Sequence, residues 1–304
     1  MEFTASSRVL TLTSLSSTDC GAGLAHFPTH AGGGGPTIVH MGRIGYEPAW
    51  SAMQSFTAVR SEHTRDELWI AEHPPVYTVG LAGRAEHFPR IRPSAGVPSA
   101  TLQAIHASAV PPVSSTPPVS STSPVSSTSP VSSTLPVSST LPVSSIPLVR
   151  SDRGGQITYH GPGQVIVYAL VDLVRRGVKV REMVCLLEQA AIDVLGDHGI
   201  AAERKAGAPG VYVAGGDRRG AKIAALGLKV KRQGCYHGIS LNVDMDLTPF
   251  AAIDPCGYPG LPVTSMRQMG VQAGVTAVGE MLAGHIARAL EALPAPAGAA
   301  RKDS

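Results

Sequence analysis

Six consecutive hexads, PPVSST, PPVSST, SPVSST, SPVSST, LPVSST and LPVSSI, occupy residues 111–146 and constrain the fold more than any other feature. They contain no charged and no aromatic residue. The proline in every hexad removes backbone hydrogen-bond donors and stops a helix, and serine and threonine build no core. A six-residue period can also indicate a β-helix, but only Val recurs as an apolar side chain. We therefore expect a solvated, partly polyproline-II insertion over about residues 93–147.

The segments on either side of the insertion predict one interrupted domain, because a long surface loop costs little entropy. Apolar residues make up 43% of the chain, which is ample for a core. Helical spacing is found in three segments: 47–60, 180–200 and 277–293. Strands are indicated at residues 67–73, 76–80, 164–173, 210–216, 221–235 and 237–247. This order predicts an α+β fold, a single domain whose mixed or antiparallel sheet is flanked by helices.

Charge and hydropathy exclude several classes of protein. A formal net charge of +3 does not suggest a nucleic-acid-binding protein. The chain has no run of 18 apolar residues, and residues 1–36 lack the basic and apolar regions of a secretory signal. We therefore expect a cytoplasmic protein without membrane association, a disordered extension at residues 1–36 and a flexible tail at residues 294–304.

A glycine-rich stretch, RGGQITYHGPGQ at residues 153–164, precedes an apolar run that predicts a buried strand. It lacks the Gly-Lys-Ser/Thr of a phosphate-binding P-loop and the spacing of a dinucleotide fingerprint. Its four glycines leave backbone uncovered, so that a ligand can approach closely. A tight turn with a packed, hydrogen-bonded His160 is the alternative. Uncovered backbone suits an apolar chain as well as a phosphate.

Cys256 has the best setting for a nucleophile among the four cysteines, because DPCGYPG is a turn-forming segment and loops present reactive side chains. A small buried hydrophobe is the alternative, and it fits Cys185 in its apolar helix. Ordinary thiols are mostly protonated at neutral pH, so a nucleophilic cysteine needs a cation or a base nearby. The candidate partners are Lys222, His160 and His237. Chemistry alone ranks histidine above lysine, because Cys–His pairs are commoner.

Several separated stretches resemble the octanoyltransferases of lipoate biosynthesis, in the order and spacing of that family. They are YEPAWSAMQ, DELWIAEHPPVYTVG, RGGQITYHGPGQVIVYALVDL, KIAALGLKV, HGISLNVDMDLTPF and DPCGYPGLPVTS. They lie within about residues 37–92 and 148–293, roughly two-thirds of the chain. The resemblance implies an α+β fold shared with biotin and lipoate protein ligases, with residues 37–293 as the catalytic domain.

The same resemblance implies roles for individual residues. Cys256 matches the acyl-accepting nucleophile, and Lys222 matches the lysine paired with it. We expect burial to lower the pKa of Lys222, so that it can serve both as a cation beside a thiolate and as a base. His160 and His237 are expected to shape the pocket, and Ser240 stands where alanine is commoner. The residues that match the pocket wall are Arg153, Gly154, Gly155, Gln156, Ile157, Thr158, Tyr159, His160, Ala225, Leu226, Gly227, Gly238, Ile239 and Ser240.

The implied reaction moves an octanoyl group from octanoyl-acyl carrier protein, through a thioester on Cys256, to a lysine of a lipoyl domain. The acceptors implied are the lipoyl domains of 2-oxoacid dehydrogenases and glycine cleavage proteins. No cofactor, ATP or metal is expected, and the chain is expected to be a monomer. One alternative is an ATP-dependent lipoate or biotin protein ligase, whose glycine-rich stretch typically ends in His-Asp, whereas Gly161 follows His160 here. Another is a non-catalytic scaffold, which the presence of both Cys256 and Lys222 disfavours.

Overall fold

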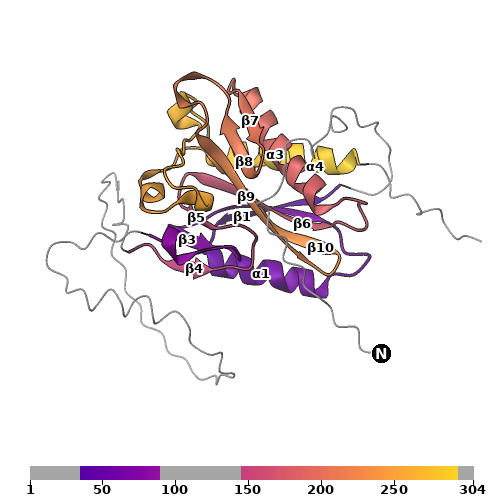
Figure 1. Cartoon of the computed structure of the whole chain (residues 1–304). Coiled ribbons are helices and arrows are strands. Elements are labelled where there is room, and N and C mark those ends of the chain that lie inside the picture. The colour runs from indigo at the N-terminus through magenta and orange to yellow at the C-terminus, as the bar shows by residue number, and fades with distance from the viewer. Residues whose placement is uncertain (1–34, 90–144, 294–304) are drawn as a thin grey trace, which may run out of the picture. The chain divides into compact units, whose positions relative to one another are not determined.

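The computed structural model describes residues 35–89 and 145–293, which are drawn in colour in Figure 1. All of them belong to one compact unit formed from both sides of the hexad segment. The expected tail and nearly all of the expected extension and insertion lie outside the described residues. Their assignment, and the division of the chain into domains, therefore stay predictions.

A seven-stranded sheet forms the centre of the described part, with the strand order β1-β2-β6-β10-β9-β8-β7. The first two strands pair in parallel and every other neighbouring pair is antiparallel. This confirms the predicted α+β class with a mixed sheet. The strands are β1 (Thr37–Arg43), β2 (Glu67–Glu72), β6 (Gln164–Asp172), β7 (Ala202–Lys205), β8 (Ala208–Val213), β9 (Lys222–Lys231) and β10 (Gly234–Asn242).

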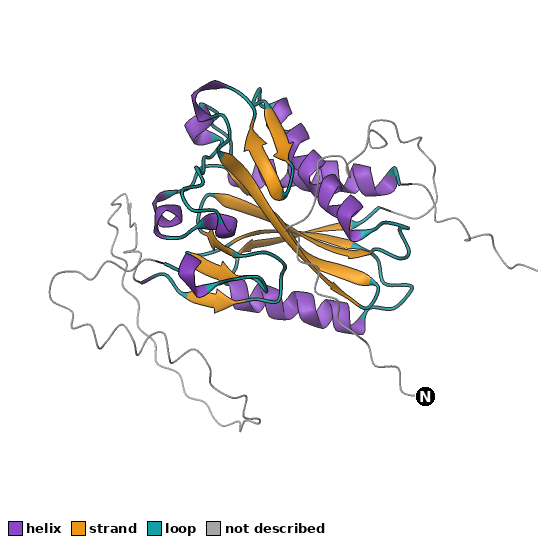
Figure 2. Cartoon of the chain, in the orientation of Figure 1, coloured by secondary structure: helices purple, strands orange, loops and turns teal. Residues whose placement is uncertain are grey.

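Helices lie on both faces of this sheet, as Figure 2 shows. Helices α3 (Val180–Asp197) and α4 (Val275–Glu291) cover one face, and α1 (Tyr46–Val59) covers the other. The central strand β6 is buried along its whole length. Its side chains alternate between the two cores, as a strand's period of two requires: Val165 and Val167 point toward α3 and α4, while Ile166 and Tyr168 point toward α1.

A second, three-stranded sheet has the order β4-β3-β5 and encloses a small core of its own. Its strands are β3 (Val76–Val79), β4 (Leu148–Arg150) and β5 (Ile157–His160). Tyr77 and Tyr159 pack there against Phe250, which lies in the short 3-10 helix η7 (Thr248–Ala252). The last residues of the sixth hexad belong to this folded part. Ile146, which replaces the threonine of the other hexads, is 8% exposed in the same core.

Candidate active site

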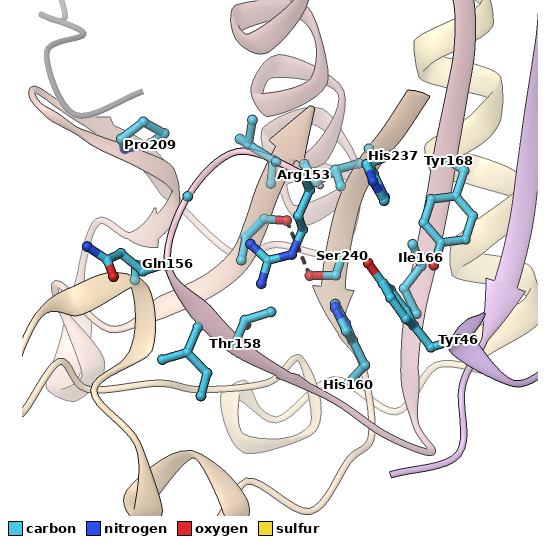
Figure 3. A pocket seen from close by; sticks show the side chains of 18 of the residues that line it. Tyr46, Arg153, Gln156, Thr158, His160, Ile166, Tyr168, Pro209, His237 and Ser240 are labelled. Atoms are coloured by element: carbon cyan, nitrogen blue, oxygen red, sulfur yellow. Dashed lines mark hydrogen bonds between the residues drawn. The ribbon is translucent and has the colours of Figure 1, made fainter. Parts of the chain in front are cut away.

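An open pocket lies on the α1 side of the large sheet. Strands β9 and β10 line it on one side, and β5 with the loop that precedes it lines it on the other. The empty space of the pocket, including the part open to solvent, amounts to about 850 Å³. Figure 3 shows Tyr46 and Tyr168 on one side of the pocket, with Gln156 and Pro209 on the opposite side. Gly238 at the centre of β10 lines the cavity, and a Cβ on it would lie 2.0 Å from Val167 O of the neighbouring strand β6.

The glycine-rich loop is held in place by backbone hydrogen bonds on both sides. The Leu81 and Ala82 amides donate to carbonyls of the loop, at 2.9 and 3.0 Å, and the Gly154 amide donates to Leu228 O of β9 at 3.0 Å. The approach is close, because a Cβ on Gly80 would lie 2.4 Å from the carbonyl oxygen of Gly155. The absence of side chains on Gly80 and on the glycines of the loop therefore allows close packing of the loop as well as access to the cavity.

Arg153 anchors the same loop from within. Its guanidinium is buried and donates to Thr78 O at 2.6 Å, to Thr78 Oγ1 at 2.9 Å and to Gly154 O at 3.0 Å. Burial lowers the pKa of Arg153 from its ordinary value. Within the described residues no carboxylate forms an ion pair with it. The loop is thus fixed to β3 by a buried cation that also lines the pocket.

Cys256 and Lys222 meet at the edge of the pocket. Lys222 begins β9 and is 3% exposed, and its Nζ lies 3.0 Å from Cys256 Sγ and 2.9 Å from Pro209 O. Cys256 is half-buried in the one-turn 3-10 helix η8 (Pro255–Gly257). The two residues are 34 positions apart, so only the fold brings the thiol and the amine together. This is the geometry of an activated nucleophile and its partner.

The electrostatics of Lys222 differ from the sequence-based expectation. Burial by itself lowers the pKa of Lys222, but attraction to Cys256 and Tyr212 and hydrogen bonds to both outweigh it, so the pKa lies above its ordinary value. The expectation of a lowered pKa is therefore wrong while Cys256 carries no acyl group. The arrangement favours the ammonium form of Lys222 beside Cys256.

Asp152, the residue before the glycine-rich stretch, joins α1 to β10. Its carboxylate accepts hydrogen bonds from Trp50 Nε1 at 2.8 Å and from the Tyr236 hydroxyl, and it pairs with His237 Nε2 at 2.8 Å. Burial raises the pKa of Asp152, but these partners hold it well below its usual range. His237 has a φ of 64°, which turns its ring out of the strand alternation and toward the pocket.

His160 lies on the pocket wall as a neutral ring. Burial, with repulsion from His73 and Arg153, lowers the pKa of His160 to about 3. Its Nδ1 is 2.6 Å from Gln164 Oε1, an acceptor, so this nitrogen carries the proton. A ring with so low a pKa is a poor base at neutral pH, which fits the pocket-shaping role expected for it.

The structure brings most of the expected site residues together around the cavity. Gly154 and Tyr159 do not line it: Gly154 bonds to β9, and the Tyr159 ring packs in the core of the small sheet. Lys222 reaches the cavity through Cys256. The expected residues that line the pocket are Arg153, Gly155, Gln156, Ile157, Thr158, His160, Ala225, Leu226, Gly227, Gly238, Ile239, Ser240 and Cys256.

Other lining residues are not indicated by the sequence patterns. Two of them have a feature in the sequence from which they could have been found. Tyr168 is an aromatic residue with a polar tip in an apolar strand, and Pro209 is a proline within a strand. Tyr46 has no such feature, because it stands at the start of an ordinary helix. His237 lines the pocket in agreement with the pocket-shaping role expected for it, and the unexpected lining residues are Tyr46, Ile166, Tyr168, Gly207, Pro209 and Tyr258.

Comparison with known proteins agrees with this geometry. Residues 137–287 match the family model of the lipoyl protein ligase A/B catalytic domain. The fold is similar to that of a putative lipoate protein ligase from T. acidophilum with bound lipoic acid, with a TM-score of 0.56, 12% identity and coverage of 84% of this chain and 86% of that one. It is also similar to lipoate-protein ligase A bound with ATP, with a TM-score of 0.54 and 13% identity. The fold is therefore that of the lipoate protein ligases.

Curated relatives narrow the assignment. An octanoyltransferase of Azoarcus sp. (strain BH72) is 48% identical over 254 residues, which cover 83% of this chain and 87% of that protein. An octanoyltransferase of Dechloromonas aromatica (strain RCB) is 44% identical over 257 residues, covering 84% and 97%. The chain belongs to the octanoyltransferase family and is an acyltransferase.

Two features are absent from residues 35–89 and 145–293. Not one of the helices there combines the length and the apolarity needed to cross a bilayer. Nor do His, Cys, Asp and Glu side chains gather there in a group that could hold a metal ion.

Proposed function

We propose that the chain transfers an octanoyl group from the thioester of octanoyl-acyl carrier protein to the side-chain amine of a lipoyl-domain lysine, by way of a thioester on Cys256. The observation that carries this proposal is the 3.0 Å contact between Lys222 Nζ and Cys256 Sγ at the edge of a largely apolar pocket. The family of the chain supports the octanoyl group as the cargo.

In the first half-reaction, the Cys256 thiolate attacks the carbonyl carbon of the carrier thioester. A C–S bond to Cys256 forms and the C–S bond to the phosphopantetheine arm breaks. The leaving thiolate takes a proton from the Lys222 ammonium, so that neither sulfur carries a charge at the end. One thioester replaces another, and the free-energy change of this step is therefore near zero.

Acylation changes the environment of Lys222. The thiolate that raised the pKa of Lys222 is consumed, while the burial that lowers this pKa remains. Lys222 is then left as a neutral amine beside the acyl-enzyme. Acylation of Cys256 thus directly produces the neutral form of Lys222, which can act as a base.

In the second half-reaction, the neutral amine of the acceptor lysine attacks the thioester on Cys256. The amine loses a proton to Lys222, the amide bond forms and the Cys256 thiolate leaves, which restores the thiolate and the ammonium. Neutralising an acceptor lysine of ordinary pKa, which releases its first proton to solvent, costs about 4.6 kcal/mol at pH 7, and Lys222 takes the second proton, which the nitrogen loses on attack. Amides are more stable than thioesters, and this step is downhill.

The test separates the two half-reactions. The full-length chain is incubated with octanoyl-acyl carrier protein without ATP, and its intact mass and Cys256 peptide are analysed. We expect one octanoyl group on Cys256, which leaves as an amide on an added lipoyl domain. An adduct on another cysteine would overturn the assignment of Cys256 as the nucleophile. Transfer from free octanoate that requires ATP would favour a ligase instead.

A further inference from the structure

One peptide group links Lys222 to a carboxylate on the opposite side of strand β8. The carbonyl oxygen of Pro209 accepts a hydrogen bond from Lys222 Nζ at 2.9 Å. The amide of the next residue, Gly210, belongs to the same peptide group and donates to Glu188 Oε1 at 2.8 Å. A peptide group is planar, and its C=O and N–H point in opposite directions. The carboxylate and the ammonium therefore lie at opposite ends of one peptide dipole, each at the end that stabilises it.

The backbone at this point is shaped for the contact. Gly210 has a φ of 131°, a conformation that other residues rarely adopt. A Cβ there would lie 2.7 Å from Lys222 Cε and 2.8 Å from Ala224 O. The register between β8 and β9 also shifts between Val211 and Tyr212. The missing side chain leaves the space through which Lys222 reaches the Pro209 carbonyl.

Both oxygens of the Glu188 carboxyl group are held by hydrogen bonds. Glu188 lies on α3 and is 4% exposed, and the donors are the Gly210 amide and, for the second oxygen, Arg204 Nε at 3.1 Å. Arg204 in turn donates to Cys185 O at 2.8 Å and Gln189 Oε1 at 2.9 Å. Burial raises the pKa of Glu188, while the Gly210 amide, Arg204 and Lys222 act against that shift.

We propose that Glu188 is a positioning residue for Lys222: through the Pro209–Gly210 peptide it fixes the place of the Lys222 amine beside Cys256 and favours the ammonium form. The proposal rests on the role of Lys222 given above. Glu188 does not line the cavity; it acts on Lys222 through the peptide group and by charge attraction. The other charged or titratable groups around the pair are Cys256, Tyr212, Tyr258, Arg153, Lys205 and Arg204.

The test is the pH dependence of alkylation of Cys256 by iodoacetamide in the full-length protein, followed by mass spectrometry of the Cys256 peptide. Glu188→Gln keeps an oxygen for the Gly210 amide, removes the charge, and replaces the oxygen that accepts from Arg204 Nε with an NH2 group. We expect alkylation of this variant to be at least about threefold slower near neutral pH, because its Lys222 ammonium supports the thiolate less well. The rates should converge at high pH, where the thiol ionises without that help.

The matched control is Glu182→Gln, the same change on the same helix. Glu182 accepts a hydrogen bond from the Lys179 amide at 2.7 Å at the start of α3, and glutamine can still accept it. Its profile should match that of the unchanged protein. A Glu188→Gln profile that also matches would overturn the proposal. That variant keeps the hydrogen bond to the Gly210 amide and loses the charge, so an unchanged profile would show that the charge does not act on Lys222.

Two more variants separate the possible failures. Lys222→Met should slow neutral alkylation strongly; if it does not, the role of Lys222 fails and the role of Glu188 with it. If Lys222→Met slows alkylation and Glu188→Gln does not, only the inference about Glu188 fails. Should Glu188→Gln not fold, Glu188→Asp, whose carboxylate is one methylene short of the Gly210 amide, should slow alkylation in the same range, and an unchanged profile would overturn the proposal.

Discussion

Cys256 is the residue at which reactivity and backbone conformation coincide. Its φ of 58° and ψ of 17° lie in the left-handed region, where a residue with a side chain is strained by about 1 kcal/mol or more. Gly257 follows with a φ of 76°, and a Cβ on it would lie 3.1 Å from the Gln156 side chain. The turn therefore presses against the glycine-rich loop and holds the thiol at the edge of the pocket.

Lys222 should matter to the rate and not to the fold. We expect Lys222→Met to slow acylation of Cys256 by octanoyl-acyl carrier protein by about 10²-fold, because proton transfer and thiolate stabilisation are both lost. Methionine keeps much of the buried aliphatic volume, so the melting temperature should change little. The measurement is single-turnover acylation by rapid quench and intact mass, with circular dichroism on the same samples. Normal acylation by a folded variant would refute the role.

His160 should make the protein sensitive to acid. An unfolded histidine has a pKa near 6.5, and the folded pKa of His160 is about 3. Its contribution to the free energy of unfolding is fully present above about pH 6.5 and is lost as the pH falls toward about 3, because only the unfolded chain binds the proton readily. Urea unfolding at about pH 7 and about pH 5 should therefore show a smaller loss for His160→Asn than for the unchanged protein. Equal losses would contradict this.

At the scale of elements, a buried carboxylate ties the loop before β2 to the turn after β6. Asp66 accepts hydrogen bonds from Arg60 Nη2 at 3.0 Å, Arg175 Nη2 at 2.6 Å and Arg176 Nε at 2.7 Å, and its side chain is fully buried. The Asp172 amide donates to it at 2.8 Å. These contacts tie the start of β2 to the end of β6.

Loss of this carboxylate should destabilise the fold. We expect Asp66→Asn to lower the free energy of unfolding by about 3 kcal/mol, because the arginine cations remain without their counter-charge. Asp244→Asn is the control, since the Asp244–Arg267 pair is exposed at 47% and 62% and should contribute less than about 1 kcal/mol. Denaturant unfolding of the two variants measures the difference. Similar losses would contradict the special place of Asp66.

The elements that sequence patterns predict are those with strong periodicity. The helices α1, α3 and α4 and the buried strands β2, β3, β6, β8, β9 and β10 are all indicated. Strands β1, β4, β5 and β7 are missed. Strands β1, β4 and β7 are edge strands with exposed or half-buried residues and no alternation, and β5 lies within the glycine-rich stretch. The contact of Glu188 with Gly210 cannot be predicted, since a charged residue within an apolar helix gives no sign of its partner on a strand.

At the scale of the whole molecule, the segments on either side of residues 90–144 meet at one place in the described part. Phe88 and Ile146 are both buried in the small core around Tyr77. The site, by contrast, is built from the loop before β5, from β9 and β10 and from the turn at Cys256. Phe88 and Ile146, which lie close to either end of residues 90–144 in the sequence, thus pack in one cluster.

Removal of the hexads should leave the reaction intact. We expect deletion of residues 111–146, with Ile146 restored at the junction, to keep transfer of the octanoyl group to a lipoyl domain within about twofold of the unchanged protein. The reason is that loop closure depends only weakly on loop length, by about 0.6 kcal/mol per doubling. Acceptor mass shift over time is the measurement. Loss of activity in a folded deletion variant would show that the segment takes part in function.

The shared cluster of Phe88 and Ile146 also has a consequence for how the number of hexads changes over generations. A tandem run is prone to gain and lose units when it is copied, and here each unit would enter or leave between two fixed anchor points. Selection acting on catalysis would then exert little pressure on copy number. Otherwise near-identical descendants of this chain should differ in the number of hexads while keeping the isoleucine that closes the last one.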